Sequence, residues 1–600
     1  MTHQQAQCII AYRAENGGFQ SIYELQAVRE LPPDVIERLR PFVMVRDPGT
    51  TIDRTLIRRI RQESDNYLLM RLSRAWNAEE DGHPYKGGPE HLLVRFRSQR
   101  PGDFSFGFNT EKDAGEPLEW NPSTQYYGLD RWTFHAQLQN KGIIKNLIVG
   151  DFQAQYGQGL VLGGGFGAGK GAETITTIRR ANAGIFPFTS AYESGNLRGA
   201  AVTLRLPRAL ELSLLCSRVR RDASLEEGPD GWGVTSLQRS GLHRTATELA
   251  GKRQVKDTQA GIVLTRKWGS WEAGTQFVYS AFDLPLSPNA TPYNQFSFRG
   301  RSFQNAGLFF SYNTERFSSF GEFALTIDHG LGFVVGVLCV VSKKLDVAVL
   351  LRHYEPDYYT RFSNAIGENS SPSNEHGSYL GWRYQFNRRL SFTGYLDLFT
   401  FPWLRYRAYS PSSGYEWLAR LTYQPSRNVL LYAQAREEMK LRNAPSVSPG
   451  YVQETGIKNN YWLHVEVGLR EHLRLRTRFQ ASRFQQGRSV SGGMALSQDV
   501  RMNWGHIEVI ARYALFDTEN YDNRIYSYEN DVLLAYSMPA YNGTGIRKML
   551  MMRVALNRHL TLWGRYAETV STQPEALSPN ATTPRYMTDR EMRFQLRIQF

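Results

Sequence analysis

The sequence predicts a mainly β protein, a large antiparallel transmembrane β-barrel of about 24 strands behind a small all-α N-terminal module. Three observations predict this fold. Apolar and polar residues alternate with a period of two along one segment after another. The connections between these segments alternate between short turns and long polar loops. Residues 9–43, in contrast, show the spacing of short helices.

The clearest predicted strand covers residues 591–600. Its apolar members are Met592, Phe594, Leu596, Ile598 and Phe600, and every residue between them is polar. The pattern resembles the C-terminal strand of bacterial outer-membrane barrels, whose terminal Phe is read by the barrel-assembly machinery. The resemblance implies that Phe600 is an assembly signal and that this machinery is a partner. Taken alone, the pattern also fits an edge strand of a soluble sheet.

The same alternation predicts which side chains face the lumen. It recurs in residues 380–398, 415–423, 461–480 and 560–566. Arginine on the lipid-facing side at mid-depth costs about 2–4 kcal/mol, so the polar side of each strand should face inward. The predicted lumen-facing arginines are Arg474, Arg476, Arg478, Arg565, Arg593 and Arg597.

The strand count begins near residue 66 and gives about 24, within a range of roughly 22–26. Short turns on one side and long loops on the other place the short side in the periplasm, and two periplasmic chain ends require an even number. Residues 524–556 do not divide cleanly into strands. A barrel this wide cannot be filled by its wall side chains alone, so its lumen must be open or plugged.

Composition agrees with a barrel in the bacterial outer membrane, with lipid as its surroundings. No stretch approaches the roughly 20 apolar residues of a membrane-spanning helix. A net charge of +14 suits a wet lumen lined with arginine, although in a soluble protein it would indicate an anionic partner. Three distant cysteines suggest neither a disulfide framework nor a metal site. No export signal is visible, so we expect the true start to lie upstream.

A glycine-rich insert at about residues 157–196 is the predicted plug. Gly163, Gly164, Gly165, Phe166 and Lys170 form its centre. Residues 164–171 nearly match a phosphate-binding loop, but Gly171 replaces the hydroxyl residue that would hold Mg²⁺, and no helix follows. Close packing of glycine backbone inside the barrel is therefore the better interpretation, and no cofactor is predicted.

Residues 1–48 form the predicted helical module, residues 49–65 a linker and residues 66–600 the barrel. The segment IIAYRAENGGFQSIYELQAV, followed by VIERLRPFV, resembles the helix-hairpin-helix module of competence-type DNA-binding proteins. In that family a Gly-x-Gly hairpin offers backbone N–H groups to a DNA phosphate. Here the matching residues are Glu30, Leu31 and Pro32, so both glycines are lost and a proline without an N–H takes one place. The hairpin is thus predicted to be degenerate for DNA.

Together with residues 111–117 and 150–159, the chain resembles helix-hairpin-helix outer-membrane barrel proteins of Bacteroidota-type bacteria. The resemblance implies location and architecture but supplies no mechanism. No nucleophile or metalloprotease motif is present, so an enzyme is not predicted. Three functions remain open. They are a channel or transport pore narrowed by the insert, with a periplasmic module that docks a protein; a DNA-uptake component; and a non-transporting scaffold.

Overall fold

The wall of the molecule is one closed sheet of 24 antiparallel strands. The computed structural model describes residues 3–16, 19, 22–28, 31–39, 42–43, 54–63, 65–76, 85–124, 126–165, 167, 169–229, 231–444, 452–572 and 586–600. Each strand pairs with its neighbour along the chain, and β1 (Asn66–Trp76) pairs with both β2 and β31, which closes the ring. The predicted fold and its strand number are confirmed.

The other wall strands are β2 (Glu90–Arg100), β3 (Phe104–Lys112), β6 (Arg131–Lys141), β7 (Ile144–Gln155), β9 (Leu197–Leu206), β10 (Leu210–Arg221), β13 (Val255–Trp268), β14 (Trp271–Leu286), β15 (Gly300–Asn313), β16 (Phe317–Thr326), β17 (Leu331–Ser342), β18 (Leu345–Tyr354), β19 (Glu375–Gln385), β20 (Leu390–Phe401), β21 (Ser412–Ser426), β22 (Val429–Asn443), β23 (Gln453–Arg470), β24 (Leu473–Gln486), β25 (Ser489–Trp504), β26 (Ile507–Thr518), β29 (Gly543–Ala555), β30 (Leu560–Thr572) and β31 (Tyr586–Gln599). Smaller strands are β4 (Glu119–Asn121), β5 (Tyr126–Gly128), β8 (Gly184–Pro187), β11 (Ala223–Gly228), β12 (Gly231–Leu237), β27 (Ile525–Tyr526) and β28 (Ala540–Tyr541).

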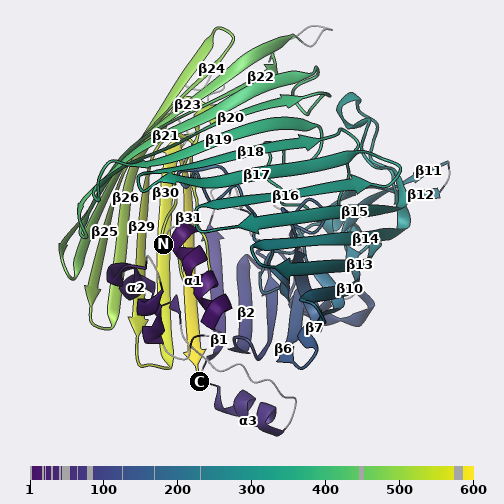
Figure 1. The fold of residues 1–600 in the computed structure, drawn as a ribbon. Helices are drawn as coiled ribbons and strands as arrows, with labels where there is room; N and C mark the ends of the chain where they lie inside the picture. Colours follow the sequence, from purple (N-terminus) through teal and green to yellow (C-terminus); the bar gives the residue numbers. More distant parts are fainter. Residues whose placement is uncertain are drawn as a thin grey trace.

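The two ends of the barrel differ in their connections. At one end, which we call the short-turn end, neighbouring strands are joined by two to four residues. Most connections at the opposite, long-loop end are longer, and the β11–β12 hairpin projects there (Figure 1). Because the strand number is even, β1 starts and β31 finishes at the short-turn end, where Figure 1 places the C-terminus.

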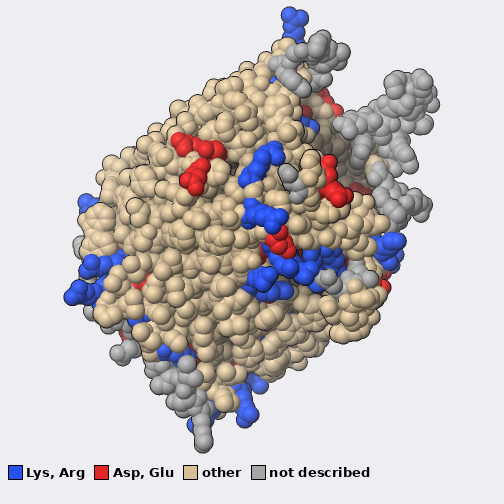
Figure 2. All heavy atoms as spheres, turned by 90° about the vertical axis from the view of Figure 1, so that its right-hand side faces the viewer, with Lys and Arg blue, Asp and Glu red and all other residues tan. Residues whose placement is uncertain are grey.

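The outer face of the wall is apolar. Large apolar side chains exposed on the outer face of β10–β16 include Leu214, Ile262, Leu264, Phe277, Tyr279, Leu308, Phe323 and Leu325. Figure 2 shows that most of this side of the molecule carries neither basic nor acidic residues. Near the short-turn end Trp271 lies 4.7 Å from Tyr312 and 6.4 Å from Trp268, as in the aromatic girdle of a membrane barrel.

Two long connections fold into the barrel. The insert between β7 and β9, residues 156–196, contacts inward-facing side chains from β10 through β21. Residues 519–542, which join β26 to β29, contact β22 through β1. A single segment can touch so many consecutive strands only from inside the ring. The inward connection explains why residues 524–556 do not divide into strands, since β29 begins only at Gly543.

A third connection, residues 355–374, is also turned inward, although its sequence reads as an ordinary polar loop. The backbone N–H of Gly163 in the insert donates to the carbonyl of Phe362 (2.6 Å), and the N–H of Asn364 donates to the carbonyl of Gly159 (3.1 Å). Tyr358 and Ile366 are buried in the same core cluster as the insert. The loop therefore covers the insert from the long-loop end.

The helical elements are α1 (His3–Asn16), η1 (Ile22–Ala27), α2 (Pro33–Leu39), α3 (Arg54–Gln62) and the short α4 (Ala246–Ala250), with one-turn 3-10 helices η3 (Pro122–Thr124), η4 (Pro292–Asn294) and η5 (Tyr521–Asn523). Among the described residues no helix has the length and apolarity needed to cross a bilayer. Helix α2 starts at Pro33, whose fixed φ suits the first helical position.

The predicted linker also contains a helix, α3, which the sequence analysis missed. Leu56 is its buried apolar residue, and Arg59 donates from Nε to Oδ2 of Asp103 (2.6 Å) in the β2–β3 turn. The N-terminal module lies at the same end, because Nε2 of Gln7 in α1 donates to Oδ1 of Asn313 (3.4 Å) where β15 finishes.

Candidate functional site

The insert is fastened to the wall by Glu322, a fully buried residue of β16. Its carboxylate accepts the backbone N–H groups of Gln158 (2.5 Å), Leu160 (3.1 Å) and Val161 (3.3 Å). Nε2 of Gln276 donates to it as well (2.7 Å). A buried carboxylate is stable only with such partners. The carboxylate of Glu322 and the N–H groups at the start of the insert therefore satisfy each other's hydrogen-bonding needs.

Glycine is required where the insert approaches this carboxylate. Gly157 has φ +56, and a Cβ there would lie 2.6 Å from Oε2 of Glu322. The predicted plug glycines are placed as follows. Gly163 and Gly164 donate to the carbonyls of Phe362 (2.6 Å) and Ala154 (2.8 Å), and Gly165 donates to Oε1 of Gln155 (3.0 Å). Phe166 lies outside the described residues.

Lys170 forms the second attachment of the insert. Its Nζ lies 2.7 Å from Oδ2 of Asp397 on β20 and 3.3 Å from Oε2 of Glu416 on β21, and it also contacts Glu368. Burial alone would lower the pKa of Lys170, but the three carboxylates outweigh burial and raise it. Lys170 is therefore committed to the wall. We call Lys170, Glu368, Asp397 and Glu416 the lysine latch.

Apolar packing completes the contact between insert and wall. Leu160, Val161, Leu162, Ile175, Ile178 and Ile185 of the insert are all buried. They share one core cluster with wall residues such as Phe309, Phe320, Tyr354, Tyr379 and Tyr395. The hydroxyl of Tyr379 also donates to the carbonyl of Thr174 (2.9 Å). The core of this molecule thus lies inside the barrel, between the insert and β14–β21.

The predicted lumen arginines lie on the polar side of their strands. The structure also shows which acidic side chains balance their charge. Arg565 is fully buried against the inward segment 519–542, where it contacts Glu529 (2.7 Å) and Asp531 (3.7 Å), and it also contacts Glu591 of β31. Arg593 contacts the same Asp531. The sequence analysis missed Glu529 and Asp531 as partners, since they lie in the segment that it could not divide.

The other predicted arginines differ in their partners. Arg474 and Arg476 both contact Glu466 (3.0 Å each), and Arg476 lies 3.6 Å from Asp499. In Arg478 and Arg597 the buried Nε has no hydrogen-bond partner among the described residues. Arg597 stacks over the ring of Tyr67 at 5.2 Å. Part of the inner wall therefore carries positive charge that nearby acids do not fully satisfy.

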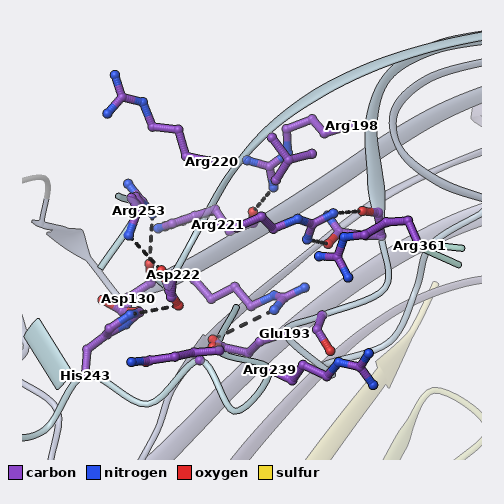
Figure 3. Close-up of a pocket in the computed structure, with 17 residues that line it drawn as sticks. Asp130, Glu193, Arg198, Arg220, Arg221, Asp222, Arg239, His243, Arg253 and Arg361 are labelled. Carbon is purple, nitrogen blue, oxygen red and sulfur yellow. Dashed lines mark hydrogen bonds and ion pairs between the residues drawn. The ribbon is translucent and has the colours of Figure 1, made fainter. Parts of the chain in front are cut away.

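A cavity of about 100 Å³ opens at the long-loop end, and arginine dominates its lining. Seven arginines line it, together with Asp130, Glu193, Asp222 and His243. Figure 3 shows Arg221, Arg239 and Arg361 near Glu193, whereas Arg220 extends away from them. We call Arg131, Arg221, Arg239, Arg253 and Arg361 the arginine pocket. Its members come from four segments far apart in the chain, so no local sequence pattern reveals it.

A buried histidine fixes one side of this pocket. His243 Nδ1 lies 2.6 Å from Asp130, and Nε2 lies 3.1 Å from Asp222. Burial alone would lower the pKa of His243, but the two carboxylates raise it to about 10. His243 is therefore a cation at neutral pH, and together with Lys252 it balances the charges of Asp130 and Asp222.

In the part of the chain that the structure describes, three groups of side chains bring ligand atoms within 4.8 Å of one another, as a metal site would. In two of these groups a lysine of the protein already provides the cation. Lys252 contacts the group of Glu116, Asp130 and His243, and Lys170 and Lys440 contact the group of Glu368, Glu416 and Glu438. His91, Glu111 and Asp113 form the third group, in which Nε2 of His91 contacts Oε1 of Glu111 at 2.7 Å. That pair is also an ordinary ion pair.

The degenerate hairpin is built into the core of the N-terminal module. Leu31 is buried beside Cys8, Leu25, Val35 and Ile36. The carbonyl of Pro32 accepts the N–H groups of Val35 (3.0 Å) and Ile36 (3.1 Å), which starts α2. Glu30 lies outside the described residues. The role of Phe600 as an assembly signal stays a prediction; its ring is 54 % exposed and lies 6.2 Å from that of Phe96.

The N-terminal module matches a known protein family. Residues 1–44 match the family model of the helix-hairpin-helix motif, which confirms the interpretation of the N-terminal module. No curated protein matches the chain. The chain is therefore a helix-hairpin-helix module joined to a closed 24-stranded β-barrel whose apolar outer face is that of an outer-membrane protein.

Several solved structures are similar to this chain, each at low identity. A mutant of the ferric enterobactin receptor PfeA from Pseudomonas aeruginosa is 8 % identical, with a TM-score of 0.41, covering 90 % of this chain and 81 % of the other. The copper transporter OprC is 8 % identical, with a TM-score of 0.44 and coverage of 92 % and 82 %. The siderophore receptor PirA from Acinetobacter baumannii is 8 % identical, with a TM-score of 0.40 and coverage of 90 % and 81 %. Identities and TM-scores this low say nothing about which ligand this chain binds.

Proposed function

We propose that this protein is a transport-related pore of the bacterial outer membrane, closed in the described state by the insert and regulated by its release. The observation that supports this most directly is the placement of the insert. Residues 156–196 lie inside the wall and are attached to it at Glu322 and at the lysine latch. A barrel of this width without such a filling would be open.

The wall does not depend on the insert. β7 and β9, the strands that flank the insert, pair directly with each other, with Ile148 opposite Ala201 and Phe152 opposite Leu197. The ring therefore stays closed if the insert leaves the lumen. The lysine latch also favours a reversible attachment, because a buried ion pair contributes little net stability once desolvation is counted.

We also propose that the N-terminal module is a periplasmic docking piece for a protein partner. Oδ1 of Asn313 supports this role, because it accepts from Gln7 of the module (3.4 Å) and from Nη1 of Arg179 in the insert (2.8 Å). The module and the insert thus meet at one side chain of the short-turn end. A partner that binds the module would act close to the attachment of the insert.

The lysine latch gives the test of this function. We expect the Lys170→Met variant to open more often in planar bilayers than the unmodified barrel. It leaves two wall carboxylates, Asp397 and Glu416, and Glu368 of the inward loop facing an apolar side chain. Lys343→Met, in the exposed β17–β18 turn, is the matched control and should behave like the unmodified protein. Equal conductance of all three proteins would contradict closure by the insert.

DNA uptake is the second proposal, and the helix-hairpin-helix match is the observation that favours it. We expect the purified protein to bind duplex DNA only weakly, with a Kd above roughly 10⁻⁴ M near physiological salt, because Leu31 is buried and Pro32 has no N–H. The Glu30→Gly, Pro32→Gly double variant should bind more tightly if the hairpin once held phosphate. Micromolar, strongly salt-dependent binding by the unmodified protein would promote DNA uptake to the first proposal.

A further inference from the structure

The arginine pocket holds more positive charge than the surrounding residues compensate. Arg221 is buried, and its Nε lies 3.3 Å from Oδ2 of Asp257. Arg361 lies 3.4 Å from the same oxygen, so two guanidinium groups share one carboxylate. Arg239 is exposed, and no carboxylate forms an ion pair with it among the described residues.

The acids that line the pocket do not restore the balance. Asp130 and Asp222 are both held by His243, and Asp130 also contacts Lys252. Glu193 lies 3.9 Å from Nη1 of Arg131, but burial raises the pKa of Glu193 to about 9, which keeps this carboxyl protonated at neutral pH. The buried Nε of Arg131 has no hydrogen-bond partner among the described residues.

The geometry of these arginines favours one kind of ligand. Arg221 belongs to the end of β10, Arg239 to the loop before α4, and Arg361 to the inward loop 355–374. They reach the cavity from three separate elements (Figure 3). A flat carboxylate pairs with one guanidinium fork, whereas a tetrahedral phosphate group offers oxygens in several directions.

We propose that the arginine pocket is a binding site for a phosphate-bearing anion at the long-loop end of the barrel, held by Arg239 and Arg361. The buried Arg221, whose Nη1 and Nη2 donate to Asn196, adds positive charge beside them. Two sources share this chemistry, a soluble phosphorylated molecule and the phosphorylated headgroup of a lipid. Glu193 and Asn196 of the insert also line the cavity, so the site is complete while the insert occupies the lumen.

The alternation of side chains along each wall strand shows which arginines face the pocket and which face the outer surface. Arg131 and Arg221 are on the inner face, in register with the buried residues His135 and Ser217. Arg198 and Arg220 also line the cavity but alternate with these inner residues, and Arg198 lies over Phe134, whose ring is 52 % exposed. Arg220 is therefore a control position of the same residue type in the same strand as Arg221.

The test is a binding titration of the purified, detergent-solubilised barrel with inorganic tripolyphosphate, followed by calorimetry at two salt concentrations. We expect binding that weakens with salt, and a loss of affinity of about tenfold in each of Arg239→Ala and Arg361→Ala, since a charge-assisted contact is removed. Arg220→Ala should bind as the unmodified protein does. Unchanged heat-modifiable mobility on gels shows that each variant is folded.

A second titration separates the two sources. Vesicles that contain phosphorylated lipid A are compared with vesicles of the dephosphorylated lipid, using the same variants. Binding to tripolyphosphate supports a soluble ligand, and binding only to the phosphorylated vesicles supports a lipid headgroup, provided that Arg239→Ala weakens it. Equal affinity for citrate and tripolyphosphate, an equal loss in Arg220→Ala, or no binding to either phosphate probe would overturn the proposal. Phosphate binding is judged from Arg239→Ala against Arg220→Ala, and pore opening from the conductance of Lys170→Met, so the two proposals can fail separately.

Discussion

Deleting residues 157–196 is expected to convert a closed barrel into an open pore. β7 and β9 already pair up to Phe152 and Leu197, so a short Gly-Ser turn can join them without disturbing the wall. The deletion removes the contacts with Glu322 and with the lysine latch at once. Conductance in planar bilayers should rise by at least about tenfold, because side chains alone do not fill a lumen of this width.

The control for this deletion is a connection that lies outside the wall. The β11–β12 hairpin projects from the long-loop end (Figure 1), and its tip at residues 226–233 can be replaced by a two-residue turn. This shortened hairpin should leave the conductance unchanged. A folded insert deletion with the conductance of the unmodified protein would contradict the plug, and would assign closure to the segment at residues 519–542.

Replacement of Arg565 by leucine is expected to produce the largest loss of stability among single substitutions at ion pairs. Among the described residues, the change leaves Arg547 and Arg593 as the ion-pair partners of Glu529, Asp531 and Glu591. Glu529 and Asp531 are almost fully buried, so their charges cannot be solvated by water. Breaking a buried pair in this way costs about 3–5 kcal/mol. Thermal unfolding in detergent, followed by circular dichroism, measures the effect.

Arg590→Leu is the matched control. Arg590 also pairs with a glutamate across the β30–β31 ladder, Glu568 at 2.8 Å, but its side chain is 55 % exposed. Exposed pairs contribute little, so the unfolding temperature should not change measurably. Equal effects of the two substitutions would mean that the inward segment at residues 519–542 does not bury the charges of Arg565 and Glu529.

The wall of the barrel could be predicted because the alternation of residues within each strand shows which side chains face outward and which face the lumen. In β31, Phe594 is 57 % exposed whereas its neighbour Gln595 is 2 % exposed, and the sequence shows this difference directly as an alternation of apolar and polar residues. The insert could be predicted because a run of glycines interrupts that alternation. Both signals are local, and a single chain carries them without any knowledge of its neighbours.

The remaining parts of the site depend on contacts between distant segments. In the sequence, Glu322 looks like any other inward-facing polar residue of a strand. Its role appears only when residues 158–161 are placed against it. The loop at residues 355–374 resembles a solvent-exposed connection because charged and polar residues outnumber its apolar ones, although Tyr358 and Ile366 are buried. The arginine pocket likewise arises only when four separate segments meet at one end of the barrel.

The pairing of β1 with β31 has a consequence for how the molecule forms. Arg71 and Gln595 share a hydrogen bond across this seam although 524 residues separate them along the chain. Contacts between residues so far apart carry a large loop-closure entropy and are slow to form. Until they form, β1 and β31 each expose an unpaired edge that can add strands from other chains. The kinetic vulnerability of this protein therefore lies at its seam, and assembly must protect two β-edges until the ring has closed.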